Sequence, residues 1–245
     1  MVAQCIIDSL LIKLIKFLKI LCTTALKSAI LEIAPNFEML ENIIIDFHFG
    51  PTTALLQEMN NRIDADIVIL TQEGIDSLIN ANILQAPRTD IASTAIGVAM
   101  KAGTPKPDIS TTEHFKRFLL DAPSLAYTSD GVSGMYVAEL IKHLKLTDSL
   151  ASKTKRVKGG YAGDLIIKGE AAYALQNISE LRPVSGLEVV GPLPSEYQRT
   201  TMFSAALTAS SKRDELSAAF LMALAAPSAH SILKSNGLEP ISNHE

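Results

Sequence analysis

Tryptophan is absent from this 245-residue sequence, and aromatic residues make up only 5% of it. Proteins that hold single-stranded nucleic acids stack the bases on aromatic side chains, and this chain offers few of them. The net charge is −4, from 22 Lys and Arg against 26 Asp and Glu. A mildly acidic chain lacks the basic footprint that attracts a phosphate backbone. These absences argue against nucleic acid as a partner.

Cysteine and histidine are also scarce. The two cysteines, Cys5 and Cys22, both lie near the N-terminus, and the five histidines are scattered. No spacing typical of a metal site is present, so we expect neither a metal nor a cofactor. Cys22 falls in an apolar segment, which predicts a free and buried thiol.

Enzyme signatures are missing from the chain. It contains no phosphate-binding loop and no dinucleotide fingerprint. The segment Val132-Ser133-Gly134 lacks the first glycine of a nucleophile elbow. Asp64 and Asp66 are close in sequence, but they have no recognisable catalytic partner, so we interpret them as structural. The sequence therefore favours a binding protein over an enzyme.

Strand and helix patterns alternate along the chain. Hydrophobic residues make up 47% of it and charged residues 20%, a composition typical of a globular protein. The predicted strands are 18–22, 42–47, 66–70, 95–100, 124–127, 172–176, 187–190 and 201–208. The predicted helices are 26–36, 52–62, 72–81, 112–120, 134–144, 161–168, 214–225 and 228–236. This alternation predicts parallel strand pairing in α/β layers.

Two breaks in the pattern, near 92–107 and 191–201, predict two lobes. We expect lobe I to comprise 18–95 and 203–245, and lobe II to comprise 96–202. Each lobe would be a mostly parallel sheet flanked by helices. A ligand would lie in the cleft between the lobes, where strand ends and helix starts face each other.

Three segments repeat one arrangement, in which an apolar strand leads through small or hydroxylated residues into a helix. The joining residues are Thr23-Thr24-Ala25, Gly50-Pro51-Thr52-Thr53 and Gly131-Val132-Ser133-Gly134. A helix start carries unpaired N–H groups and a partial positive charge. Three such starts converging on one point would hold an anion without a formal cation. Threonine capping and ordinary turns explain the same residues, and capping uses the same N–H groups.

The N-terminal segment 1–17 is atypical. It is strongly apolar, but Lys13 and Lys16 come late, whereas a secretory signal places its positive charge first. It is broken too often by charge to be a membrane span. We interpret it as an unusual leader or as an added helix, and both alternatives stay open.

Several segments resemble the periplasmic molybdate-binding proteins, which are solute-binding subunits of ABC importers with a two-lobed, class II periplasmic-binding fold. The resemblance covers 18–241 as an ordered series, in which no single motif is decisive. The matching segments are Lys19-Ile20-Leu21-Cys22-Thr23-Thr24-Ala25-Leu26-Lys27, Gly50-Pro51-Thr52-Thr53, Ala65-Asp66-Ile67-Val68-Ile69-Leu70, Gly134-Met135-Tyr136, Gly169-Glu170-Ala171-Ala172, Gly191-Pro192-Leu193-Pro194, Ala226-Pro227-Ser228-Ala229-His230 and Gly237-Leu238-Glu239-Pro240.

The resemblance implies a monomeric periplasmic protein that closes on a small oxyanion such as molybdate or tungstate and then docks on a membrane permease. Carried over by position, the ligand-binding residues would be Thr23, Thr24, Ala25, Thr52, Thr53, Ser133, Gly134, Gly159, Gly160 and Asn177. Two of them depart from the family, which has serine at Ala25 and tyrosine near Asn177. These departures motivate an alternative, a cytoplasmic sensor or enzyme-like relative that binds a small organic acid.

Overall fold

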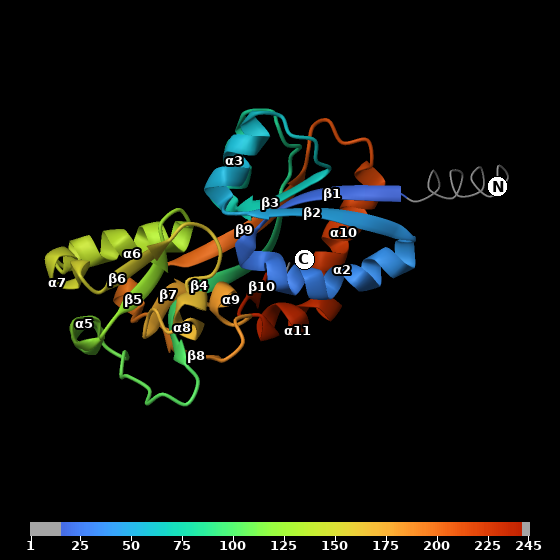
Figure 1. The fold of residues 1–245 in the computed structure, drawn as a ribbon. Coiled ribbons are helices and arrows are strands. Elements are labelled where there is room, and N and C mark those ends of the chain that lie inside the picture. Colours follow the sequence, from blue (N-terminus) through green and yellow to red (C-terminus); the bar gives the residue numbers. More distant parts are fainter. Residues whose placement is uncertain (1–15, 242–245) are drawn as a thin grey trace, which may run out of the picture.

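The computed structural model describes residues 16–241, which fold into two α/β lobes (Figure 1). Most of the segment 1–17 therefore lies outside the described residues, as does Cys5. The last two residues of this segment, Lys16 and Phe17, begin the first strand of the sheet. The predicted two-lobed α/β fold is confirmed.

Lobe I is built on a sheet with the strand order β2-β1-β3-β9. The first three strands are parallel, and β9 runs antiparallel to β3. The strands are β1 (Lys16–Thr23), β2 (Ile43–Gly50), β3 (Ile67–Thr71), β9 (Thr200–Leu207) and the short β10 (Glu239–Pro240). The helices are η1 (Thr24–Leu26), α2 (Lys27–Glu41), α3 (Thr52–Asn60), α4 (Gln72–Asn80), α10 (Asp214–Ala225) and α11 (Pro227–Ser235).

Lobe II continues the same sheet in the order β4-β7-β5-β6, with β8 also paired to β4. Its strands are β4 (Thr89–Lys101), β5 (Leu125–Thr128), β6 (Thr154–Val157), β7 (Tyr173–Asn177) and β8 (Leu187–Pro192). Its helices are α5 (Thr112–Asp121), α6 (Val132–His143), α7 (Thr147–Ala151), α8 (Asp164–Ile167), α9 (Ile178–Leu181) and η2 (Ser195–Tyr197).

Strand β4 connects the two lobes (Figure 1). Its residues Thr89 to Ala95 pair with β9, and Ile96 to Met100 pair with β7. The change of partner falls between Ala95 and Ile96, and the division of the lobes at that point stays a prediction. Both β4 and β9 are antiparallel to their neighbours. The expectation of mostly parallel sheets thus holds for β1, β2 and β3 and for β5, β6 and β7, but not for β4, β9, β8 and β10.

Several predicted elements differ in extent from the observed ones. The helix predicted over 161–168 shrinks to the four residues of α8, and ahead of it the Ala162 N–H donates to the Gln176 side chain at 2.8 Å. Helix α2 runs through Pro35 and ends only before Asn42, which has a left-handed φ of 51°. The short elements β6, α7 and α9 were not predicted.

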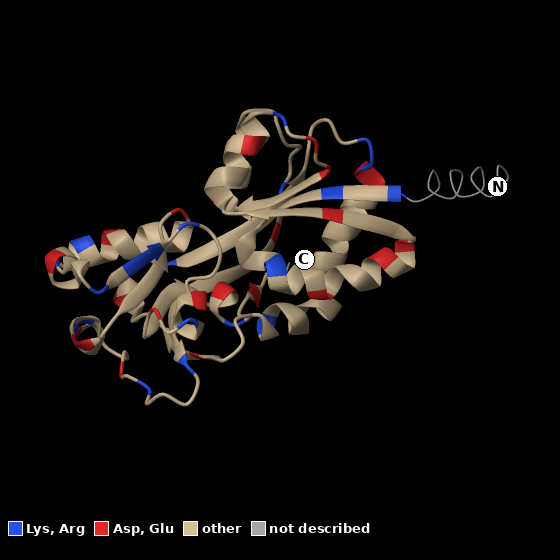
Figure 2. Cartoon of the chain, in the orientation of Figure 1, with Lys and Arg blue, Asp and Glu red and all other residues tan. Residues whose placement is uncertain are grey.

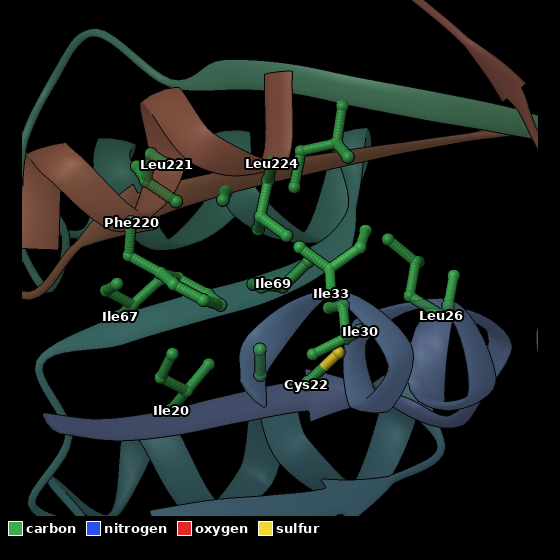
Figure 3. Packing of buried hydrophobic residues seen from close by; sticks show 14 of the residues in the cluster. Ile20, Cys22, Leu26, Ile30, Ile33, Ile67, Ile69, Phe220, Leu221 and Leu224 are labelled. Atoms are coloured by element: carbon green, nitrogen blue, oxygen red, sulfur yellow. The ribbon is translucent and has the colours of Figure 1, made fainter. Parts of the chain in front are cut away.

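The larger apolar core lies in lobe I, between the sheet and the helices α2, α10 and α11. Isoleucines of β1 and β3 meet Phe220 and Leu224 of α10 there (Figure 3). Cys22 is fully buried in the same cluster as a free cysteine, as predicted, and burial raises the pKa of its thiol.

Over residues 16–241 no single helix is long and apolar enough to span a membrane; α10 and α11 reach that length only as a pair bent by 62°.

Candidate functional site

A small cavity lies where the two lobes meet, at the C-terminal ends of β1, β5 and β7. The space open to the centre of a water-sized sphere is about 30 Å³, within a hollow of about 400 Å³ that includes its mouth. That space suits a pair of waters or one small anion better than a large metabolite. The lining residues are Thr23, Thr24, Ala25, Pro51, Thr52, Thr71, Thr128, Asp130, Gly131, Val132, Gly159, Gly160, Asn177, Glu180, Thr201 and Phe203.

Two of the longer helices, α3 and α6, begin at this cavity without a side-chain cap. The residue before α3 is Pro51 and the residue before α6 is Gly131, and neither can supply a capping oxygen. By contrast, Thr71 caps α4 with its own hydroxyl, which accepts from the Gly74 N–H. The first N–H groups of α3 and α6 thus keep no partner within their own helices, and the helix dipoles place partial positive charge at the cavity.

Threonine hydroxyls supply further donors. Thr23 and Thr52 are both buried, and the Thr52 hydroxyl donates to the Thr23 hydroxyl at 3.4 Å. The Thr128 Oγ1 atom is buried and has no hydrogen-bond partner among the described residues. A buried hydroxyl without a partner costs stability unless a ligand or water satisfies it. The Thr52 O–H is thus engaged with the Thr23 oxygen, whereas the O–H groups of Thr23 and Thr128 remain as donors for a bound anion.

Formal positive charge does not line the cavity, since its lining within residues 16–241 includes no Lys, Arg or His. Figure 2 shows Lys and Arg interspersed with Asp and Glu along both lobes. Two acidic residues are present instead. Asp130 accepts the Gly159 N–H at 2.8 Å, and its carbonyl accepts the Thr53 hydroxyl at 3.1 Å. The latter contact joins the start of α3 in lobe I to lobe II.

The second acid, Glu180, sits beside Asn177 at the start of α9. The Asn177 Nδ2 donates to the Glu180 Oε2 at 3.0 Å, and the Asn177 Oδ1 has no partner among the described residues. Burial raises the pKa of the Glu180 carboxyl to about 7. Burial, with the neighbouring Glu180 charge as a second cause, raises the pKa of Tyr161 to about 12. The cavity thus contains a carboxyl group that exchanges a proton near neutral pH.

The structure brings seven of the ten predicted site residues together. Thr23, Thr24, Ala25, Thr52, Gly159, Gly160 and Asn177 line the cavity. Thr53, Ser133 and Gly134 do not line it. Ser133 is buried in the first turn of α6, and Gly134 packs against the backbone of Thr128. A ligand contact by any of the ten stays a prediction.

Sequence reasoning missed other lining residues, above all Thr128, Asp130 and Glu180. Thr128 ends β5 just as Thr23 ends β1, so the shared pattern of a hydroxyl at a strand end could have found it. The sequence favours a structural role for Glu180, as for Asp64 and Asp66, because no catalytic partner is recognisable.

A larger hollow of about 1470 Å³, against about 400 Å³ for the cavity described above, is lined by residues such as Lys16, Phe17 and Arg213. It sits at the opposite end of β1 from Thr23. In α/β sheets ligands bind beyond the carboxyl ends of the strands, which selects the smaller cavity as the candidate site.

Comparisons with known proteins agree with the fold. Residues 18–239 match the family described as bacterial extracellular solute-binding protein. A curated relative, aconitate isomerase of a Pseudomonas species, is 30% identical over 231 residues, covering 91% of this chain and 88% of that protein.

Solved structures share the fold at lower identity. The periplasmic molybdate-binding protein of Azotobacter vinelandii superposes with a TM-score of 0.75 at 16% identity, covering 93% of this chain and 100% of that one. The tungstate-binding protein of Desulfovibrio alaskensis superposes with a TM-score of 0.64 at 14% identity, covering 93% and 99%.

Proposed function

The chain belongs to the family of bacterial extracellular solute-binding proteins, and we propose that its solute is a small tetrahedral oxyanion of the molybdate class. The observation that carries this proposal is the cavity itself, in which two uncapped helix starts and three threonine hydroxyls meet without a cation. A dianion there would receive several charge-assisted hydrogen bonds, each contributing about 1.5–3 kcal/mol.

The size of the cavity supports the same class of ligand. A space of about 30 Å³ for the centre of a water-sized sphere leaves room for one compact anion while the lobes are in contact. A tricarboxylate would need the lobes to separate further. Neutral donors fixed at helix starts select an anion by its radius, since they cannot move without moving the helices.

Calorimetric titration with molybdate, tungstate, sulfate and phosphate tests the proposal. We expect at least one of these anions to bind with a dissociation constant in the micromolar range or below.

Thr52→Val removes a buried hydroxyl at the start of α3 and should weaken that binding at least tenfold, an effect of about 1.4 kcal/mol. Thr112→Val is a matched control, because Thr112 lies on α5 with its hydroxyl on Glu113. A folded protein that gives no heat and no thermal shift with any of the four would refute the proposal.

We also propose an export route and a partner for this protein. A solute-binding protein of this kind would act outside the cytoplasm and deliver its anion to an ABC permease. Cell fractionation tests the location: we expect the protein among exported proteins, trimmed near residue 17. Protein found only in the cytosol would favour a sensor or an enzyme.

A second candidate function is the isomerisation of an unsaturated organic acid such as aconitate. Two observations favour it: the 30% identical relative named aconitate isomerase, and a cavity carboxyl, Glu180, whose pKa of about 7 lets it take up and return a proton.

Incubating the protein with trans-aconitate and following the cis isomer by NMR tests this candidate. Turnover that Glu180→Gln abolishes would establish an enzyme. Absence of turnover, together with tight oxyanion binding, would leave the binding protein as the function.

A further inference from the structure

The pair formed by Asn177 and Glu180 has a geometry that an anion site alone does not require. Both side chains line the cavity and both are more than nine-tenths buried, with 4% and 8% of their surfaces exposed. Asn177 donates to Glu180 at 3.0 Å and leaves its acceptor, Oδ1, without a partner among the described residues. An unpaired buried acceptor costs stability, and it repels any anion that approaches it.

Charged groups on the elements packed against α9 do not neutralise Glu180. No cation forms an ion pair with it among residues 16–241, where Arg182, at the end of α9, instead donates to the Ser235 carbonyl. The other titratable or charged groups on or near these elements are Cys22, Asp90, Lys101, Asp130, Tyr161, Asp164, Tyr173 and Glu188. Of these, Asp90 pairs with Arg88 and Glu188 with Lys106.

We propose that Asn177 and Glu180 couple anion binding to the uptake of one proton, an inference that rests on the proposed oxyanion function. The amide of asparagine is nearly the same shape when its oxygen and nitrogen exchange places. A half-turn of the Asn177 amide therefore puts the donor Nδ2 in the place of the acceptor Oδ1 without changing the shape of the side chain.

The two protonation states favour opposite orientations of this amide. An ionised Glu180 only accepts hydrogen bonds, so it holds the Asn177 Nδ2 and turns Oδ1 away from itself, as in the structure. A protonated Glu180 can donate to Oδ1 instead, which turns Nδ2 toward the cavity as a donor for the anion. The proton stays on Glu180 while the anion is bound, so binding adds one proton to the protein and breaks no covalent bond.

Calorimetric titration with molybdate and with sulfate tests this coupling, because neither anion titrates between about pH 7 and about pH 9. We expect the dissociation constant of the wild-type protein to rise with pH throughout this range, and by about tenfold between about pH 8 and about pH 9, the slope of one linked proton. Titrations in buffers of different ionisation enthalpy should report about one proton taken up for each anion bound.

Variants separate the coupling from a general effect of charge. Glu180→Gln keeps an amide that can donate to Asn177 at every pH, so its affinity should be independent of pH and close to that of the wild type at low pH. Glu170→Gln, an exposed control just before the start of β7, should retain the wild-type slope. Asn177→Ala should weaken binding at low pH, where Nδ2 contacts the anion, more than at high pH.

The outcomes distinguish the two proposals. Binding with no pH dependence and no proton uptake would overturn the coupling and leave the oxyanion function intact. Equal weakening of Asn177→Ala at both ends of the pH range would overturn the change of orientation of the amide. Absence of binding by any of the four anions, at low or high pH, would overturn the oxyanion function and the coupling with it.

Discussion

Replacing Gly134 with alanine should lower the free energy of unfolding by about 3 kcal/mol, the upper part of the range for overpacking. A Cβ atom at this position would lie 1.9 Å from the Thr128 carbonyl oxygen and 2.4 Å from its hydroxyl. The oxygen belongs to the backbone of β5, so it cannot turn aside as a flexible side chain would. Either α6 or the end of β5 must shift, and both border the cavity. Urea denaturation measures the loss.

Gly74→Ala is the matched control for this prediction. Gly74 also sits in the first turn of a helix beside the cavity, in α4, but a Cβ there meets nothing nearer than 3.4 Å. Alanine is the better helix former by about 1 kcal/mol, so this variant should be neutral or slightly stabilised. Equal stability of the two variants would show that the close approach of α6 to Thr128 is not a constraint on the fold.

The role of Gly134 illustrates what sequence could and could not establish about the site. The motif Gly131-Val132-Ser133-Gly134 correctly indicated a strand end that turns into a helix start. It did not say which residues of the motif face the cavity. Gly131 and Val132 line it, whereas Gly134 serves the packing of α6 on β5. That distinction depends on the rotation of the helix about its axis, which sequence spacing alone does not fix.

Elements with strong local signals could be predicted well. Residues Ile67 to Leu70 are fully buried in β3, and an unbroken apolar run predicts such a strand. Short elements such as α9 could not be predicted, because four residues span little more than one helical turn and show no repeat of the apolar pattern. Tertiary contacts hold the chain in such places: the Ser179 N–H donates to the Thr94 hydroxyl, and that hydroxyl donates to the Gly237 carbonyl.

Glu180 is the main lining residue of the cavity that could not be predicted from the sequence. Its position on α9 follows from contacts with strands far away in the chain, so its burial is a property of the fold and not of the local sequence. The same burial is what makes the residue functionally interesting. A carboxyl removed from water without a cation holds its proton to a higher pH, and ionising it destabilises the folded state.

Glu180→Gln should accordingly stabilise the protein at alkaline pH by about 3 kcal/mol relative to the wild type. The pKa of Glu180 is raised from its usual 4.5 to about 7 in the folded protein. The folded state therefore favours the protonated form, so the stability is fully present below pH 4.5 and is lost as the pH rises through about 7. The difference of about 2.5 pH units corresponds to about 3 kcal/mol at full ionisation. The glutamine variant carries no titrating group and avoids this loss.

Thermal unfolding without ligand, at about pH 5 and about pH 9, measures the effect. The melting temperatures of the wild type and of Glu180→Gln should lie closer together at the lower pH. At the higher pH they should separate by several degrees, since each kcal/mol moves the midpoint of a chain of this size by about 2–4 °C. Glu170→Gln should follow the wild type, because its side chain is about half exposed and its ionisation costs the fold little. Parallel curves for the wild type and Glu180→Gln would mean that Glu180 is already ionised at the lower pH, and the proton needed for the Asn177 half-turn would then be lacking.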